Sequence, residues 1–428
     1  MGNLGDAHVS WRARAKFLAS FVSARGLQFL APIVAANLLS RSDYGVIEFA
    51  HAAASLAIAV ASLGTLGVVP FVILSSLGRA TLGAVILHQA GLVVVSLIIY
   101  CCAAILVNPL SSPALVALFT AVFALQGFWV YLLRARDAVT RSLFLEALPF
   151  TLVAVAASVA WVVAPTHSLF IVAGALLCAL VACVWATASQ WPRLVPTYST
   201  PLHYVDTLRE GIPLMLGGLL ALLATTSGRL GIGLVGDAEM TGAFAALSRI
   251  AALPIVAHQL AVVARFRDLY AINLPQLELL VMQVGRFVAI SVALTLLAVP
   301  WASPWLGPAF HLAAQQHPLA AMLLVAQVIL WSGISLNDLI AARHEVLPRV
   351  LPWSSSALAV VGTVAAWSLT SDVVTVDRFA IWHTTVMFTL FFAQTVALAC
   401  CGVRFNRFWA SCVFAFAGAI ALAICLAP

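Results

Sequence analysis

A carboxylate and an imidazole lie three residues apart in the stretch R-S-D-Y-G-V-I-E-F-A-H, residues 41–51. The spacing of Glu48 and His51 places both side chains on one face of a helix, and Ser55 and Ser62 continue that polar face. Ionisable groups inside membrane segments mark ion and substrate pathways, so we take Glu48 and His51 as candidates for gating or ion coupling. The alternatives are solvation of Glu48 at a helix end and a hydrogen bond from His51 between helices.

Four arginines also fall inside apolar runs: Arg25, Arg229, Arg249 and Arg286. A charged side chain at the bilayer centre costs about 2.5–3.5 kcal/mol on insertion scales, so such residues usually face a watery interior. A cationic cavity selects an anionic ligand, and guanidinium groups bind phosphate oxygens in pairs. Gln28 lies one turn after Arg25 on the same face. We therefore predict that these five residues bind an anionic headgroup.

The simpler interpretation is that an arginine reaches the membrane interface or pairs with an acid. It suits Arg229, near the end of its run, and Arg286, for which Glu278 and Asp338 are potential partners. The other two arginines have no acid one helical turn away, so we favour the binding role for them. Asp338 follows two serines at helical spacing and is a third candidate for gating or ion coupling, with solvation at a helix end as its alternative.

Histidines and cysteines elsewhere in the apolar runs suggest packing instead. No metal ligand set is expected, because the eight cysteines lie in apolar runs without His or Asp at ligand spacing. The same packing role is expected for His88, His258 and His383.

The elements that position these candidates must be membrane helices. Hydrophobic residues make up 63% of the chain and charged residues 8%, and the mean hydropathy is +1.08, which excludes a soluble globular protein. About thirteen continuous apolar runs are each long enough to cross a hydrocarbon core of roughly 30 Å. The predicted fold is an all-α polytopic membrane protein with about 12–13 transmembrane helices, one of them spanning residues 46–69.

Basic residues predict the orientation of these helices. One set of alternate loops holds Arg12, Arg14, Lys16, Arg79, Arg134, Arg136, Arg141, Arg193, Arg209, Arg265, Arg267, Arg343, Arg349, Arg404 and Arg407. The opposite set holds only Arg41 and Arg378. By the positive-inside rule the N-terminus is cytoplasmic. The basic loops account for the pI of about 9.1, so no nucleic-acid partner is expected.

A repeated motif divides the chain into two bundles. S-R-S-D-Y-G (40–45) is expected to form the outer turn between the first two helices, and G-D-A-E-M-T-G-A-F (236–244) repeats it about 197 residues later. Six predicted helices separate the copies, which indicates a parallel repeat. The same offset places Arg249 at position 52, beside His51, so both halves are expected to line one central cleft. The predicted domains are an N-terminal bundle (1–190), a Pro-containing cytoplasmic linker (191–210), a C-terminal bundle (211–403) and an additional helix (404–428).

Several short motifs are similar to those of a known family: L-L-S-R-S-D-Y-G, S-L-G-T-L-G-V-V-P, G-I-P-L-M-L-G-G-L-L and A-V-P-W-A-S-P-W-L-G-P-A-F. Together they resemble Wzx-type polysaccharide flippases of the multidrug/oligosaccharidyl-lipid/polysaccharide exporter (MOP) superfamily. Two features depart from that family. Gly228 stands where an acidic residue usually precedes the arginine of the seventh helix, and thirteen helices differ from the usual twelve or fourteen.

The resemblance implies a MATE/MOP-like pair of six-helix bundles in the bacterial inner (plasma) membrane. It implies a transporter, not an enzyme, that moves a polyprenyl-pyrophosphate-linked oligosaccharide to the outer leaflet by alternating access, for O-antigen, exopolysaccharide or capsule assembly. No cofactor is expected, and H⁺ or Na⁺ is the candidate coupling ion. The expected partners are this substrate, membrane lipid and a polysaccharide polymerase or chain-length machinery. A cation-coupled multidrug antiporter of the same fold and a peptidoglycan-precursor flippase are the alternatives.

Overall fold

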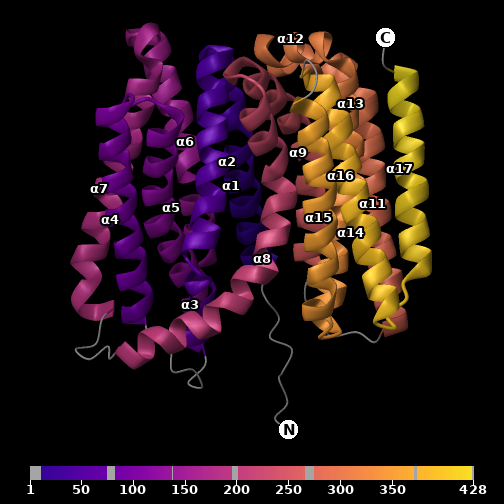
Figure 1. Cartoon of the computed structure of the whole chain (residues 1–428), viewed down its shortest axis with the longest axis horizontal. Coiled ribbons are helices and arrows are strands. Elements are labelled where there is room, and N and C mark those ends of the chain that lie inside the picture. The colour runs from indigo at the N-terminus through magenta and orange to yellow at the C-terminus, as the bar shows by residue number, and fades with distance from the viewer. Residues whose placement is uncertain are drawn as a thin grey trace. The chain divides into compact units, whose positions relative to one another are not determined.

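The computed structural model describes residues 11–74, 82–136, 138–194, 201–265, 274–370 and 374–426, and this part of the chain is helical without strands (Figure 1). The first helices are α1 (Trp11–Leu38), α2 (Arg41–Ala61), α3 (Thr65–Leu74), α4 (Leu82–Leu106), α5 (Ser112–Ala135), α6 (Val139–Val163), α7 (Ser168–Leu194) and α8 (Pro201–Val235). The later helices are α9 (Ala238–Ala264), α11 (Leu274–Ala302), α12 (Pro308–Gln316), α13 (Pro318–Ala326), α14 (Val328–Arg343), α15 (Leu347–Thr370), α16 (Val376–Cys400) and α17 (Asn406–Leu426).

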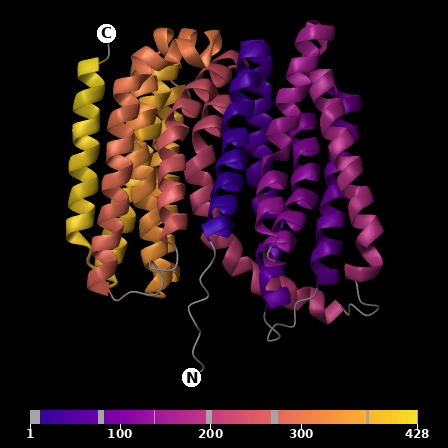
Figure 2. The same ribbon diagram turned by 180° about the vertical axis from the view of Figure 1, so that it is seen from behind.

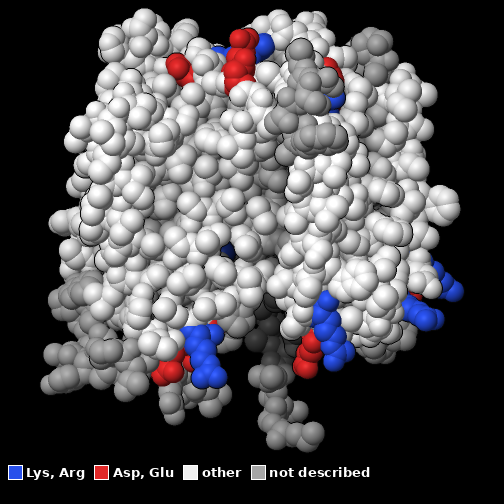
Figure 3. Space-filling model, in the orientation of Figure 1, with Lys and Arg blue, Asp and Glu red and all other residues white. Residues whose placement is uncertain are grey.

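Eleven stretches of the described residues are long and apolar enough to cross a membrane. Two further predicted runs, 211–236 and 347–370, lie on α8 and α15, which are helices of 35 and 24 residues. On the face drawn in Figure 3, most charged side chains lie toward the two ends of the helices, and one small recessed basic spot is visible at mid-height. The predicted all-α polytopic membrane fold is therefore confirmed.

The prediction of one continuous helix over residues 46–69 is wrong. The helix α2 begins earlier, at Arg41, and ends at Ala61, and α3 begins after a break. Leu63 and Gly64 have φ values of +48° and +72°, the left-handed conformation that interrupts a right-handed helix. Gly211 of α8 packs against this break, where an added Cβ would lie 2.5 Å from the Leu63 carbonyl oxygen.

The expected turn at Ser42–Gly45 is also wrong, because these residues form the first turn of α2. The side chain of Ser40 caps the helix by accepting a hydrogen bond from the backbone N–H of Asp43 at 3.0 Å. Asp237 caps α9 in the same way, accepting from Met240 N–H at 2.7 Å. The two caps are 237 − 40 = 197 residues apart, so the repeated motif is a helix start.

The repeat extends to the packing of α2 against α9. A Cβ on Gly45 would lie 1.8 Å from the carbonyl oxygen of Ala238, and a Cβ on Gly242 would lie 2.2 Å from that of Arg41. The glycines are again 242 − 45 = 197 residues apart, so each helix start lies against the matching glycine of the other helix. Only glycine permits this close approach at both positions.

The chain forms two compact units that do not follow chain order. One comprises Met1–Ala35, Ala61–Leu110 and Ala117–Leu214, and the other comprises Ala36–Val60, Ser111–Val116 and Met215–Pro428. Most of α2 therefore packs with the C-terminal helices. In that second unit α11 packs against α9, α14 and α17, and α17 lies beside α11 in both ribbon views (Figures 1 and 2).

The predicted domain boundaries stay a prediction. Of the predicted linker, residues 191–194 end α7 and residues 201–210 begin α8, whereas residues 195–200 lie outside the described residues. The additional C-terminal helix corresponds to α17.

Candidate functional site

Glu48 of α2 lies at the centre of a charged cluster in the second unit. Its side chain is 6% exposed and accepts hydrogen bonds from two arginines of other helices. Arg249 of α9 donates from Nη2 to both carboxylate oxygens, at 2.6 and 2.9 Å, and Arg229 of α8 donates from Nη1 to Oε2 at 2.7 Å. Tyr44, one turn earlier on α2, donates its hydroxyl to Oε1 at 2.9 Å. Three helices thus meet at one buried carboxylate.

Close helix packing brings these side chains together. The glycine pair described above lets α9 approach α2, and Gly233 lets α8 do the same, because a Cβ there would lie 2.2 Å from the ring of Phe49. Glu48 is seven residues into α2, or roughly 10 Å along the helix at 1.5 Å per residue. The carboxylate therefore lies deep inside the helix bundle, where an unpaired charge would be costly.

The cluster carries more positive than negative charge. Two guanidinium groups, each 14% exposed, share a single carboxylate. In the described part of the chain, the only hydrogen bond from Arg229 is the one from Nη1 to Glu48. The remaining guanidinium nitrogens of this residue are available to a second anion, so the cluster combines internal neutralisation with a surplus positive charge.

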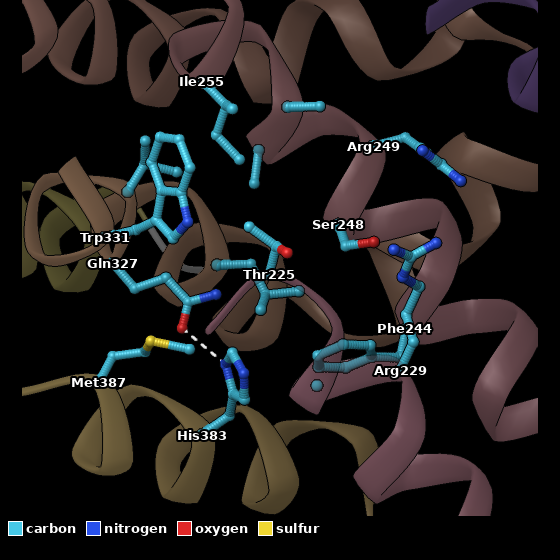
Figure 4. A pocket seen from close by; sticks show the side chains of 15 residues that line it. Thr225, Arg229, Phe244, Ser248, Arg249, Ile255, Gln327, Trp331, His383 and Met387 are labelled. Atoms are coloured by element: carbon cyan, nitrogen blue, oxygen red, sulfur yellow. Dashed lines mark hydrogen bonds between the residues drawn. The ribbon is translucent and has the colours of Figure 1, made fainter. Parts of the chain in front are cut away.

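Both arginines border a cavity of about 240 Å³ whose lining comes entirely from the second unit. Figure 4 shows Arg229 and Arg249 on one side and Trp331 and Gln327 on the opposite side. The lining residues with polar, aromatic or sulfur-containing side chains are Thr225, Arg229, Phe244, Ser248, Arg249, Gln327, Trp331, His383 and Met387. No aspartate or glutamate is among the described residues that line it, so the cavity is cationic.

Glu48, Arg229 and Arg249, all named from the sequence, meet in this cluster, but the sequence did not indicate that they pair with one another. We favoured a binding role for Arg249 because no acid lies one turn away, yet Glu48 supplies a carboxylate from another helix. The alternative interpretation of Arg229, pairing with an acid, holds in the structure. His51 follows Glu48 by one turn on α2 and is half-buried. The roles of these residues in binding or gating stay predictions.

Arg25 belongs to a separate cluster in the first unit. It donates from Nη1 to Gln28, as the three-residue spacing predicts, and its guanidinium lies 5.7 Å from the ring centre of Phe21. Glu146 of α6 is 3.8 Å from Arg25 and 2.7 Å from Arg134. Arg25 thus also has an acidic partner from a different helix.

Arg286 is apart from the Glu48 cluster. It is exposed on α11 and borders a smaller cavity of about 40 Å³. Neither potential ion pair of Arg286 forms among the described residues. Glu278 accepts the backbone N–H of Arg407 at 3.1 Å, and Asp338 accepts from Gln394 at 2.8 Å.

Asp338 of α14 faces Gln394 of α16 and is not simply solvated at a helix end. Its Oδ2 and the Oε1 of Gln394 are buried acceptors with no hydrogen-bond partner in the described ranges. A buried carboxylate oxygen without a hydrogen-bond partner can accept a proton or a small cation. This arrangement fits the predicted role of Asp338 in ion coupling, which stays a prediction.

Several residues of the cavity and the cluster have no site role predicted from the sequence. Tyr44 is one of them, and its position one helical turn before Glu48 is the sequence signal for their contact. We expected His383 to be a packing residue, but it hydrogen-bonds Gln327 at 2.9 Å and Ser227 at 3.1 Å. Gln327 and His383 stand out in the sequence as polar residues inside apolar runs. Their contact joins helices far apart in the chain, so the sequence does not show it.

No protein-family model matches the sequence, and no curated protein matches it. Solved structures with a similar fold include two MATE proteins. One is the inward-facing conformation of a multidrug resistance MATE family transporter of the MOP superfamily, with 14% identity, a TM-score of 0.55, and coverage of 89% of this chain and 94% of that one. The other is a MATE protein in complex with MaL6, with 14% identity, a TM-score of 0.52, and coverage of 91% and 94%. At this identity the likeness concerns the fold alone, and it confirms the MATE-like fold that the sequence motifs implied.

Proposed function

We propose that this chain is a membrane transporter that moves a polyprenyl-pyrophosphate-linked oligosaccharide from the cytoplasmic to the outer leaflet. The observation that carries the proposal is the charge of the cavity, where two guanidinium groups share one carboxylate. A pyrophosphate is a dense, multiply charged anion, and arginine binds its oxygens with paired hydrogen bonds. The polyprenyl tail stays in the lipid while the headgroup crosses.

The MATE-like fold and the flippase-like motifs support transport by alternating access. Such a cycle needs no bond-making step, only a charge-matched cavity that opens to either side in turn. We propose the bacterial inner membrane as the location, a cytoplasmic N-terminus, and H⁺ or Na⁺ as the coupling ion. Surface polysaccharide assembly, as O-antigen, exopolysaccharide or capsule, is the proposed process, with a polymerase or chain-length machinery as partner.

A cation-coupled multidrug antiporter is the second candidate, because one solved structure of the same fold is a multidrug resistance transporter. A cavity for organic cations needs negative charge, and the described lining supplies two arginines instead. A peptidoglycan-precursor flippase would use the same pyrophosphate chemistry and differs only in the glycan.

Transport by the purified protein in liposomes tests the proposal. A fluorescent polyprenyl-pyrophosphate oligosaccharide is supplied in one leaflet, and its arrival in the other is followed with an impermeant quencher. We expect Arg249→Ala and Arg229→Ala, which both remove a guanidinium group from the cavity, to slow transport at least tenfold, and Arg404→Ala, at an exposed position outside both clusters, to match the unmodified protein. Normal transport by both cluster variants would refute the anion cavity. Transport of a fluorescent organic cation, but not of the lipid, would favour the antiporter.

A further inference from the structure

The cavity wall opposite the arginines has a chemistry of its own. It is formed by Trp331 of α14, Gln327 at the junction of α13 and α14, and His383 of α16 (Figure 4). An aromatic ring and an amide carry no formal charge, in contrast to the two guanidinium groups. The wall must therefore recognise a different part of whatever ligand the arginines hold.

Trp331 is held in place by His258, which does not line the cavity. Its ring meets His258 edge-on, with centroids 5.0 Å apart and an interplanar angle of 74°. His258 is itself buried and fixed by a 2.7 Å hydrogen bond between Nδ1 and the hydroxyl of Ser332. Trp331 remains half-buried, and its indole Nε1 has no hydrogen-bond partner among the described residues. This N–H is therefore a donor available to an acceptor on a ligand in the cavity.

Gln327 is oriented with equal precision. Its Oε1 accepts from Thr384 at 3.3 Å and lies 2.9 Å from Nδ1 of His383. His383 is held in turn by Ser227 at 3.1 Å. The amide oxygen is thus occupied, and the amide nitrogen points into the cavity, away from His383, in Figure 4. This nitrogen has no hydrogen-bond partner in the part of the chain that the structure describes.

We propose that this wall binds one neutral pyranose ring, the sugar attached directly to the pyrophosphate. The inference rests on the proposed function, since Arg229 and Arg249 would hold the phosphates. A pyranose presents an apolar C–H face that packs on an aromatic ring and a rim of hydroxyls that accept hydrogen bonds. Trp331 supplies the ring, and the indole N–H and the Gln327 amide supply the donors.

Cavity size selects one sugar over larger ligands. Sites for drug-sized molecules occupy roughly 300–1,000 Å³, and this cavity measures about 240 Å³. It accommodates a single ring beside the arginines, and the rest of the glycan lies outside it. The first sugar is covalently joined to the pyrophosphate, so the two walls of one small cavity match the two neighbouring parts of one headgroup.

Binding of two matched probes to the purified full chain tests the subsite. One probe is farnesyl pyrophosphate, and the other is farnesyl pyrophosphate that carries a single N-acetylglucosamine. We expect the unmodified protein to bind the sugar-bearing probe about tenfold more tightly, a typical effect of one aromatic contact. Trp331→Ala should remove this preference without changing the dissociation constant of the sugar-free probe.

Further variants separate the possible outcomes. Trp331→Phe should keep part of the preference, Gln327→Leu should reduce it, and Trp305→Ala, at a ring 91% exposed and outside the cavity, should leave it intact. Equal weakening of both probes by Trp331→Ala and Gln327→Leu, or no change with either, would overturn the sugar subsite. Failure of the unmodified protein to bind the sugar-free pyrophosphate would instead contradict the proposed function. If Trp331→Ala weakens the binding of a planar aromatic cation but of neither lipid probe, the result would support the antiporter.

Discussion

Nη2 of Arg249 lies 2.6 Å from Oε1 of Glu48, although 201 residues separate the two in the chain. The contact joins α2 and α9, which the 197-residue repeat relates. The position equivalent to Glu48 on α9 is Ala245 (48 + 197), and the position equivalent to Arg249 on α2 is Ala52 (249 − 197). A symmetric helix pair therefore carries an asymmetric site, with the anion from one copy and a cation from the other.

Glu48→Gln should destabilise the protein by about 3–5 kcal/mol, because it leaves two buried guanidinium groups without their carboxylate. The measurement is thermal or denaturant unfolding of the purified protein in detergent. Glu239→Gln is the matched control, since its 3.5 Å pair with Arg41 involves a glutamate side chain that is 68% exposed. Exposed pairs contribute about 0–1 kcal/mol, so the control should unfold almost normally. Equal unfolding of the two variants would contradict a structural role for Glu48.

Arg249→Lys should slow lipid transport about tenfold while retaining the charge. Lysine cannot reproduce the two-pronged contact with both oxygens of Glu48, nor the paired hydrogen bonds to a phosphate. Initial rates in the liposome assay give the comparison, with Arg404→Lys as control. A rate equal to that of the unmodified protein would mean that charge alone matters at this position.

Gly45→Ala and Gly242→Ala should each destabilise the protein strongly, because the added methyl group meets backbone of the opposing helix at 1.8 and 2.2 Å. Both substitutions act on one helix crossing, so the double variant should lose less stability than the sum of the single variants. Gly418→Ala is the control, since nothing lies within 4 Å of a Cβ there. Alanine also favours helix more than glycine, so this variant should be neutral or slightly stabilised. Strict additivity of the two crossing variants would argue against a shared contact.

Asp338→Asn should abolish accumulation driven by an ion gradient but leave gradient-free equilibration of the lipid intact. The carboxylate oxygen without a partner is the feature that could take up H⁺ or Na⁺, and an amide cannot exchange either in the same way. Transport is compared with imposed proton and sodium gradients, one at a time. Glu278→Gln serves as control, because Glu278 accepts a backbone hydrogen bond at an exposed helix end. Full gradient response in Asp338→Asn would exclude this residue from coupling.

Local sequence patterns determined much of this protein. Hydropathy predicted the helices, because a segment must be apolar over its whole length to cross a bilayer. The motifs at residues 40–45 and 236–244 revealed the repeat, although both turned out to be capped helix starts. The arginines and Glu48 were recognised as candidates because charge is rare in such a chain and costly to bury.

Tertiary structure decided which of these residues meet. Glu48, Arg229 and Arg249 come together because three glycines allow α2, α8 and α9 to pack closely. The spacing of residues within one helix does not show which face another helix turns toward it. The break between α2 and α3 involves Leu63 as well as Gly64, and although a glycine favours positive φ, the left-handed conformation of a leucine has no signature in residue type. Helical periodicity and hydropathy are properties of a segment, whereas ion pairs and cavities depend on the register between segments up to 201 residues apart.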